Sequence, residues 1–285
     1  MKNRKKIRGT GYGHDTLALV GETADGRQAV IPSDRICSVH VTFTPAAKDL
    51  SALVAPLDFK GAHLAGVGLQ NLTEDTWECI SAELELSKHF AAAEFGVRMY
   101  PYEAADPESA AVQAFLEASL DATGAHMGAD DRAELITRAL GRPAPVTGPG
   151  AAVKGEAGKT LQSLDWPTMY GLTILPLQKR KFAPTATDTQ FDTLTEATTV
   201  REIGEAAEPI VARAAKTSPL LAEAREVAPH LTGRPALVTS PTGGAVFLYP
   251  DTYEDRNAAH EAAWELRRRF ADHYVRGGSS WKGEK

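Results

Sequence analysis

A histidine and an aspartate are adjacent near the start of the chain and follow two closely spaced glycines. His14 and Asp15 come directly after Gly11 and Gly13, and glycines let a substrate approach the backbone closely. A carboxylate near an imidazole raises the imidazole pKa and favours proton exchange near neutral pH. His40 lies on the polar face of a predicted strand, so a folded-back sheet would bring it near. His14, Asp15 and His40 are therefore the predicted acid/base groups if the chain is an enzyme.

A glycine turn is the second candidate site. Residues 240–244 read Ser-Pro-Thr-Gly-Gly, and the backbone amides of such a turn can surround a phosphate. Gly243 and Gly244 are thus predicted anion contacts, although hairpin geometry alone also requires glycines here. Residues 154–160 end like a phosphate-binding loop, but Val153 stands where that motif needs its first glycine. A flexible linker explains that segment better.

Positive charge is concentrated in two short runs, one at the start of the chain and one in its second half. Such runs can contact phosphates, and an adjacent aromatic ring can stack on a base. Solvated charge in loops is the alternative. The predicted contacts to nucleic acid or to another anion in these runs are Lys5, Lys6, Arg8, Lys179, Arg180, Lys181 and Phe182.

Composition excludes several classes of protein. The net charge of −6 argues against a protein that coats nucleic acid over its whole surface. Only Cys37 and Cys79 are present, without metal-ligand spacing, so we expect no disulfide, no metal and no cofactor. No apolar run approaches the roughly 20 residues of a membrane helix. These features predict a cytoplasmic, non-membrane protein.

The predicted elements define an α+β fold with two mixed sheet-and-helix halves. An N-terminal antiparallel hairpin sheet forms around Asp25 and Gly26, and its next strand alternates apolar and polar residues over 36–43. A strand, a turn, a strand and a helix close the chain. Helices are predicted at 73–93, 106–120, 130–140, 200–215, 219–227 and 255–275.

The length of 285 residues predicts two domains. Residues 1–142 form an N-terminal α+β domain, and residues 166–285 form a C-terminal one. The segment 143–165 is rich in proline, glycine and alanine, which is typical of a linker or mobile loop. A polar arm is predicted near 178–198, and the tail after residue 276 is expected to fray.

Scattered reactive residues and projecting basic segments favour a non-enzymatic role. We therefore expect a subunit of a cytoplasmic multimeric assembly, in which the basic leader and the arm contact neighbouring copies and nucleic acid, because such segments cost ordering entropy unless a partner receives them. The alternative is an enzyme that acts on a small, phosphorylated molecule in a cleft between the halves. A regulatory domain that binds a small molecule is the third hypothesis.

Overall fold

A computed structural model describes most of the chain and confirms the α+β class. The described residues are 6–19, 23–24, 27–45, 58–63, 72–99, 107–141, 151–154, 162–164, 166–175, 186–240 and 243–280. Within these ranges, no helix has the length and apolar character needed to cross a bilayer.

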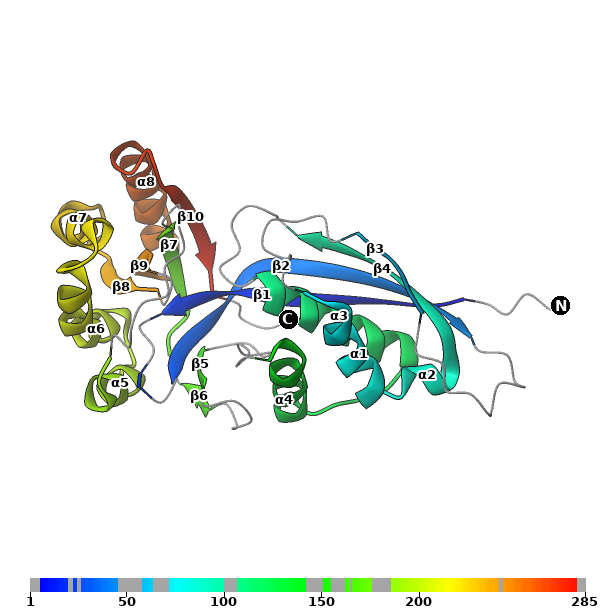
Figure 1. Cartoon of the computed structure of the whole chain (residues 1–285). Helices are drawn as coiled ribbons and strands as arrows, with labels where there is room; N and C mark the ends of the chain where they lie inside the picture. Colours follow the sequence, from blue (N-terminus) through cyan, green and yellow to red (C-terminus); the bar gives the residue numbers. More distant parts are fainter. Residues whose placement is uncertain are drawn as a thin grey trace. The chain divides into compact units, whose positions relative to one another are not determined.

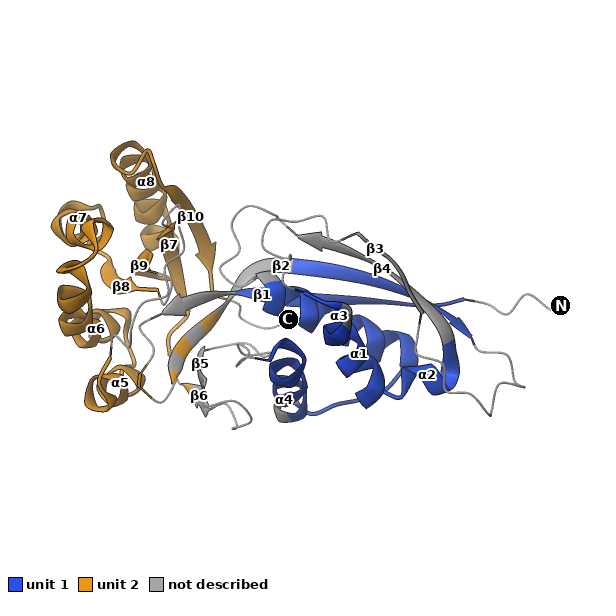
Figure 2. Cartoon of the chain, viewed as in Figure 1, with its two compact units in different colours: residues 1–15, 35–147, 157–160 blue, residues 16–34, 148–156, 161–285 orange. Residues whose placement is uncertain are grey.

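The chain forms two compact units that interleave along the sequence (Figure 2). Unit 1 contains residues 1–15, 35–147 and 157–160, and unit 2 contains residues 16–34, 148–156 and 161–285. The first two strands therefore contribute to both units. The linear division into 1–142 and 166–285 stays a prediction about domains, and the compact units differ from it chiefly by placing 16–34 with the C-terminal residues.

Unit 1 packs its helices against a mixed sheet (Figure 1). Its strands are β1 (Ile7–Leu19), β2 (Gln28–Pro45), β3 (Asp58–His63) and β4 (Phe90–Met99). Its helices are α1 (Glu74–Glu83), α2 (Leu86–His89), α3 (Pro107–Thr123) and α4 (Ala129–Leu140). Strand β1 pairs with β2. Strands β2 and β4 are antiparallel neighbours, and β3 is parallel to β4.

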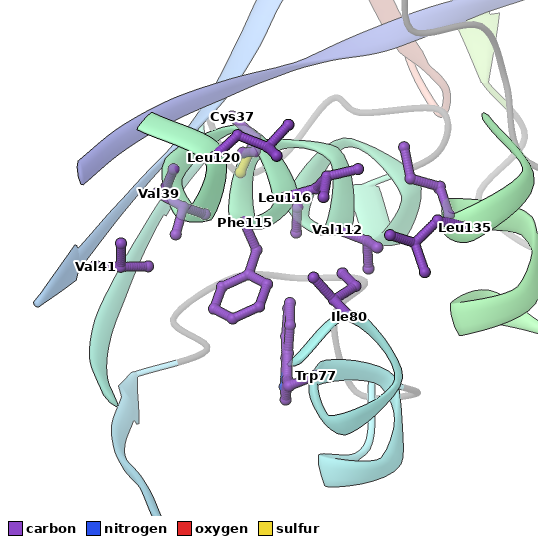
Figure 3. Close-up of a cluster of buried hydrophobic side chains, with 14 of the residues drawn as sticks. Cys37, Val39, Val41, Trp77, Ile80, Val112, Phe115, Leu116, Leu120 and Leu135 are labelled. Atoms are coloured by element: carbon purple, nitrogen blue, oxygen red, sulfur yellow. The ribbon is translucent and has the colours of Figure 1, made fainter. Parts of the chain in front are cut away.

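Alternation along β2 produces the core of unit 1, as the sequence predicts. Cys37, Val39, Val41 and Phe43 are all at most 1% exposed. They pack with residues of α1, α3 and α4, including Trp77, Ile80, Phe115 and Leu116 (Figure 3). The Trp77 and Phe115 rings meet edge to face with their centroids 4.9 Å apart. Burial raises the pKa of Cys37 to about 12, so this thiol is a core residue and not a nucleophile.

The helix predicted over 73–93 ends at Glu83, so the prediction is wrong for the second half of that segment. Glu85 has a left-handed φ of 51°, which an α-helix does not continue through. Beyond the short helix α2 the chain becomes strand β4, where Phe90 pairs with Pro45 and Ala93 pairs with Phe43. Pairing with a distant strand overrides the local helical pattern.

Glycines of β1 and alanines of α3 bring the two backbones into close contact. A Cβ added to Gly9, Gly11 or Gly13 would lie 2.0, 2.1 or 1.8 Å from a backbone oxygen of α3. Those oxygens belong to Ala118, Ala114 and Ala110, which are spaced one helical turn apart. The glycines are needed because the backbone of the helix occupies the space of any side chain.

Unit 2 is built on a four-stranded antiparallel sheet in the order β10-β7-β9-β8. The strands are β7 (Met169–Leu175), β8 (Ala236–Thr239), β9 (Ala245–Pro250) and β10 (Tyr274–Ser279). The helices are α5 (Asp188–Thr195), α6 (Val200–Ala215), α7 (Pro219–Val227), the 3-10 helix η1 (Ala228–His230) and α8 (Tyr253–Arg269). This is the order of a split β-α-β-β-α-β motif.

Both faces of this sheet are buried. Val246 and Leu248 of β9 pack with α5 and α6, whereas Phe247 and Tyr249 pack with α7 and α8. The predicted helices at 200–215 and 219–227 are confirmed. Thr199 begins α6 with a capping box, in which its hydroxyl accepts from Glu202 N and the Glu202 carboxylate accepts from Thr199 N.

Three segments that the sequence predicts to be irregular contain helices or strands in the structure. Part of the predicted arm is helix α5, whose Phe191 and Leu194 are at most 1% exposed. The predicted fraying tail is strand β10, which pairs with β7 along its length. The predicted linker contains β5 (Ala151–Lys154) and β6 (Gln162–Leu164), and β5 pairs with the start of β2. Distant pairing stabilises each strand in a way that local composition does not reveal.

Arg27 connects the start of β2 to α5 within unit 2. Its guanidinium donates to Asp188 Oδ1 at 2.8 Å and to Asp192 Oδ1 at 3.2 Å. It also lies over the Phe191 ring, 5.0 Å from the ring centroid. Both carboxylates are more than half exposed, so each ion pair contributes modestly and the cation–π contact adds to them.

Replacing Gly11 by alanine should destabilise unit 1 by about 3 kcal/mol, because the new methyl group meets backbone that cannot move aside cheaply. Urea unfolding followed by far-UV circular dichroism measures the change. Gly124→Ala is the matched control, since a Cβ there has no atom within 4 Å and only its φ of 69° opposes it. The control should cost about 1 kcal/mol. Equal losses for the two variants would contradict the close contact.

Arg27→Ala should lower the free energy of unfolding by about 1 kcal/mol, because two ion pairs and a cation–π contact are lost together. Arg201→Ala is the control, since Arg201 forms one exposed pair with Glu205 within α6. That variant should change stability by less than about 0.5 kcal/mol. If both variants unfold at the same urea concentration, Arg27 does not anchor α5.

Candidate functional site

Asp15 is a buried carboxylate beside the first turn of α3. Gly9, Gly11 and Gly13 contact successive turns of α3 in the order Ala118, Ala114 and Ala110. Asp15 continues the same face of β1, because side chains alternate along a strand. It is 3% exposed. This register places it toward the N-terminal end of α3, beyond the contact between Gly13 and Ala110.

Two uncharged polar side chains in the first turns of α3 are also buried. Ser109 is 0% exposed and Gln113 is 4% exposed, and Gln113 Nε2 lies 3.5 Å from Ser109 Oγ. A carboxylate, a hydroxyl and an amide together can accept and donate hydrogen bonds to a polar ligand. The sequence analysis missed Ser109 and Gln113. One signal in the sequence points to this helix. Glycines at alternate positions of residues 9–13 match alanines at every fourth position of residues 110–118, which indicates that the two segments pack closely.

The structure separates the three predicted acid/base groups. His14 is the neighbour of Asp15 in sequence and therefore points to the opposite face of β1. His40 is exposed, and its Nδ1 lies 3.0 Å from Thr10 Oγ1. Thr10 precedes His14 by a distance of about 13 Å along an extended strand. The two imidazoles thus belong to different positions of the sheet, and neither shares a face with Asp15.

A second carboxylate fixes the other end of the contact between β1 and α3. Asp121 Oδ2 accepts a hydrogen bond from Thr10 N at 2.9 Å. Asp121 is exposed, and its role is to bond a backbone amide. It therefore provides a comparison for Asp15, which lies at the opposite end of the same contact.

The glycine turn between β8 and β9 uses its amides internally. Gly243 N donates to Ser240 O at 2.9 Å, and Gly244 N donates to Ser240 Oγ at 2.8 Å. Gly243 has a φ of 83°, which explains why glycine occurs there. The anion contact predicted for Gly243 and Gly244 stays a prediction, and it would require these amides to exchange partners.

The predicted basic contacts are only partly placed. Lys6 and Arg8 are exposed at the start of β1. The described residues do not include Lys5 or residues 179–182, which form the second basic run with Phe182. They also do not include residues 155–160, which belong to the segment that ends like a phosphate-binding loop. Among the described residues no group of three histidine, cysteine, aspartate or glutamate side chains could hold a metal ion.

A cavity of about 1240 Å³ lies along α6 in unit 2. Its walls include α7, the loop before β8 and small residues such as Gly204 and Ala236. Glu208 and Arg225 line it and form an ion pair between α6 and α7, with both side chains about half exposed. None of the predicted site residues lines this cavity.

The fold is similar to that of solved enzymes over almost the whole chain. A homoserine kinase from Cytophaga hutchinsonii matches with a TM-score of 0.66 and 11% identity, covering 98% of this chain and 96% of that chain. A mevalonate diphosphate decarboxylase from Staphylococcus aureus matches with a TM-score of 0.64 and 12% identity, covering 98% and 97%. A mevalonate kinase matches with a TM-score of 0.63 and 10% identity, covering 98% and 100%. No protein-family model and no curated protein matches the chain.

These similarities establish the fold, and they contradict the expected non-enzymatic role. The proteins that share the fold are enzymes named for homoserine, mevalonate and mevalonate diphosphate. The prediction that the chain is a non-enzymatic subunit of a multimeric assembly that contacts nucleic acid is therefore wrong. The expectation treated Asp15 as one of several dispersed polar residues, whereas folding buries it, and Ser109 and Gln113 of α3 are buried as well.

Proposed function

We propose that the chain is an enzyme that transfers a phosphoryl group from ATP to a small molecule. The observation that carries this proposal is the shared fold, which extends over at least 96% of each of the three enzymes compared above. Two of them are named as kinases. A further structure with this fold concerns ATP binding by the mevalonate diphosphate decarboxylase from Enterococcus faecalis, with a TM-score of 0.64 and 12% identity.

Asp15 is the side chain best suited to act on the substrate. In phosphoryl transfer the acceptor oxygen forms a bond to phosphorus, the bond from phosphorus to the leaving ADP oxygen breaks, and the acceptor loses a proton. A buried carboxylate can orient the acceptor group and receive that proton. Ser109 and Gln113 would hold the same substrate by neutral hydrogen bonds. His14 and His40 remain proposed acid/base groups that would act from the opposite face of β1.

Small-molecule partners are part of this proposal, whereas other predicted partners lack support. Self-association stays a prediction, and so does a cytoplasmic location. A regulatory domain that binds a small molecule without turning it over is the competing hypothesis. Turnover distinguishes the two.

ADP release in the presence of ATP and Mg²⁺ tests the proposal. Homoserine, mevalonate and mevalonate diphosphate are the first acceptors to supply, and phosphorus NMR identifies the phosphorylated product. We expect transfer to at least one small acceptor with a free hydroxyl group. An absence of both ADP and product with a broad panel of small alcohols and acids would refute the proposal.

Asp15→Asn should reduce kcat/KM by about a hundredfold or more, because the isosteric amide cannot accept the proton. The melting temperature should change little. Asp121→Asn is the matched control on the same β1–α3 contact, and it should retain activity. His14→Ala and His40→Ala belong in the same series, and each should lose less activity than Asp15→Asn. If the Asp15 variant retains full activity, this carboxylate does not serve the reaction.

A further inference from the structure

A row of paired side chains crosses the sheet of unit 2 at Thr173. Arg276 of β10 is directly opposite Thr173 of β7, and Val246 of β9 is opposite Thr173 on the other side. Directly opposite residues of antiparallel strands project from the same face, with Cβ atoms about 5 Å apart. Thr173 therefore lies between a guanidinium side chain and a valine.

The Thr173 hydroxyl is buried and has no hydrogen-bond partner among the described residues. The residue is 2% exposed, and its Oγ1 bonds to no protein group. A buried hydroxyl without a partner destabilises the folded state, and valine would have the same shape without that cost. A buried threonine with an unpaired hydroxyl needs an explanation, and a ligand that bonds the hydroxyl supplies one.

Two of the neighbouring positions on this face are glycines. Two residues along the strands from Thr173 and Arg276, Gly171 is directly opposite Gly278. Glycine within a strand weakens the sheet and often marks a place where a ligand approaches the backbone. Gly171 and Gly278 thus place no side chain next to the hydroxyl and the guanidinium, whereas Leu248, which is opposite Gly171 on its other side, packs with α5 and α6.

Arg276 determines which chemical class of ligand suits this place. The residue is 2% exposed, and a guanidinium offers paired N–H donors that match the two oxygens of a carboxylate or phosphate. A threonine hydroxyl beside it can donate to the same oxyanion. Burial strengthens such charge-assisted bonds.

We propose that Thr173 and Arg276 bind the oxyanion group, carboxylate or phosphate, of the small molecule on which the protein acts. This inference rests on the proposed function for the identity of the ligand as a substrate. Anion binding itself can be measured without turnover. The two proposals can therefore fail separately.

Isothermal titration of the full-length protein with inorganic phosphate, and separately with acetate, tests the site. We expect one of the two anions to bind the wild-type protein. Thr173→Val should bind that anion about tenfold more weakly, because it lacks the hydroxyl. The same variant should melt about 2 °C higher than the wild type when no anion is present, because a buried unpaired hydroxyl has been removed.

Thr239→Val is the matched control. Thr239 is 1% exposed, but its hydroxyl donates to Gly244 O at 3.2 Å. Thr239 is opposite Ala245, and Ala245 is opposite Ile174, so these three side chains share one face of the sheet. Thr173 is the neighbour of Ile174 in β7, so its side chain is on the other face. This variant should melt lower than the wild type and bind the anion with unchanged affinity. Arg276→Lys retains the charge and should also weaken binding, because the paired donors are lost.

The inference is overturned if neither anion binds, or if Thr173→Val binds as tightly as the wild type. Preferential binding of acetate identifies a carboxylate substrate, and preferential binding of phosphate identifies a phosphorylated one. A protein that shows the expected losses of anion binding but transfers no phosphoryl group retains the site and refutes the proposed function. Phosphoryl transfer with unaltered kinetics in Thr173→Val retains the function and refutes the site.

Discussion

The contact between β1 and α3 is the constraint on which the candidate site depends. Alternate residues of β1 approach backbone oxygens of α3 so closely that a Cβ would lie 1.8 to 2.1 Å away. Only glycine fits, and only a small residue is compatible on the helix side. Because backbone meets backbone in this contact and cannot move aside cheaply, the contact fixes the position of the helix along the strand. Asp15 is the next residue on the same face, so its carboxylate is directed to the start of α3.

The sequence predicts well those elements that depend on local interactions. The helix predicted at 200–215 coincides with α6, whose first turn is capped locally by Thr199. Cys37 to Phe43 predict a half-buried strand by alternation alone. Elements that depend on distant pairing were missed. Phe90 to Ala93 look helical but join β4, and the glycines at the start of the predicted tail look irregular but pair with β7.

The same distinction explains what the sequence could predict of the candidate site. Asp15 was identified because a carboxylate after alternating glycines is conspicuous in a sequence. Its predicted partners were His14 and His40, since sequence proximity and sheet folding were the only guides. Neighbours in a strand face opposite ways, whereas Ser109 and Gln113 come from a helix far along the chain. Locating these side chains relative to Asp15 requires the register between β1 and α3, which no local pattern contains.

Hydrogen-bond satisfaction separates structural polar groups from those that need another explanation. Among the buried polar atoms of the described residues that lack a hydrogen-bond partner are the indole N–H of Trp166 and the hydroxyls of Thr173 and Tyr249. Trp166 and Tyr249 bury large rings, and that apolar area offsets a lost hydrogen bond. Burial also raises the pKa of Tyr249, so its hydroxyl stays neutral. Thr173 has no such compensation, because valine would bury the same volume without an unpaired hydroxyl. The threonine that packing does not require is also the one that lies opposite a buried arginine.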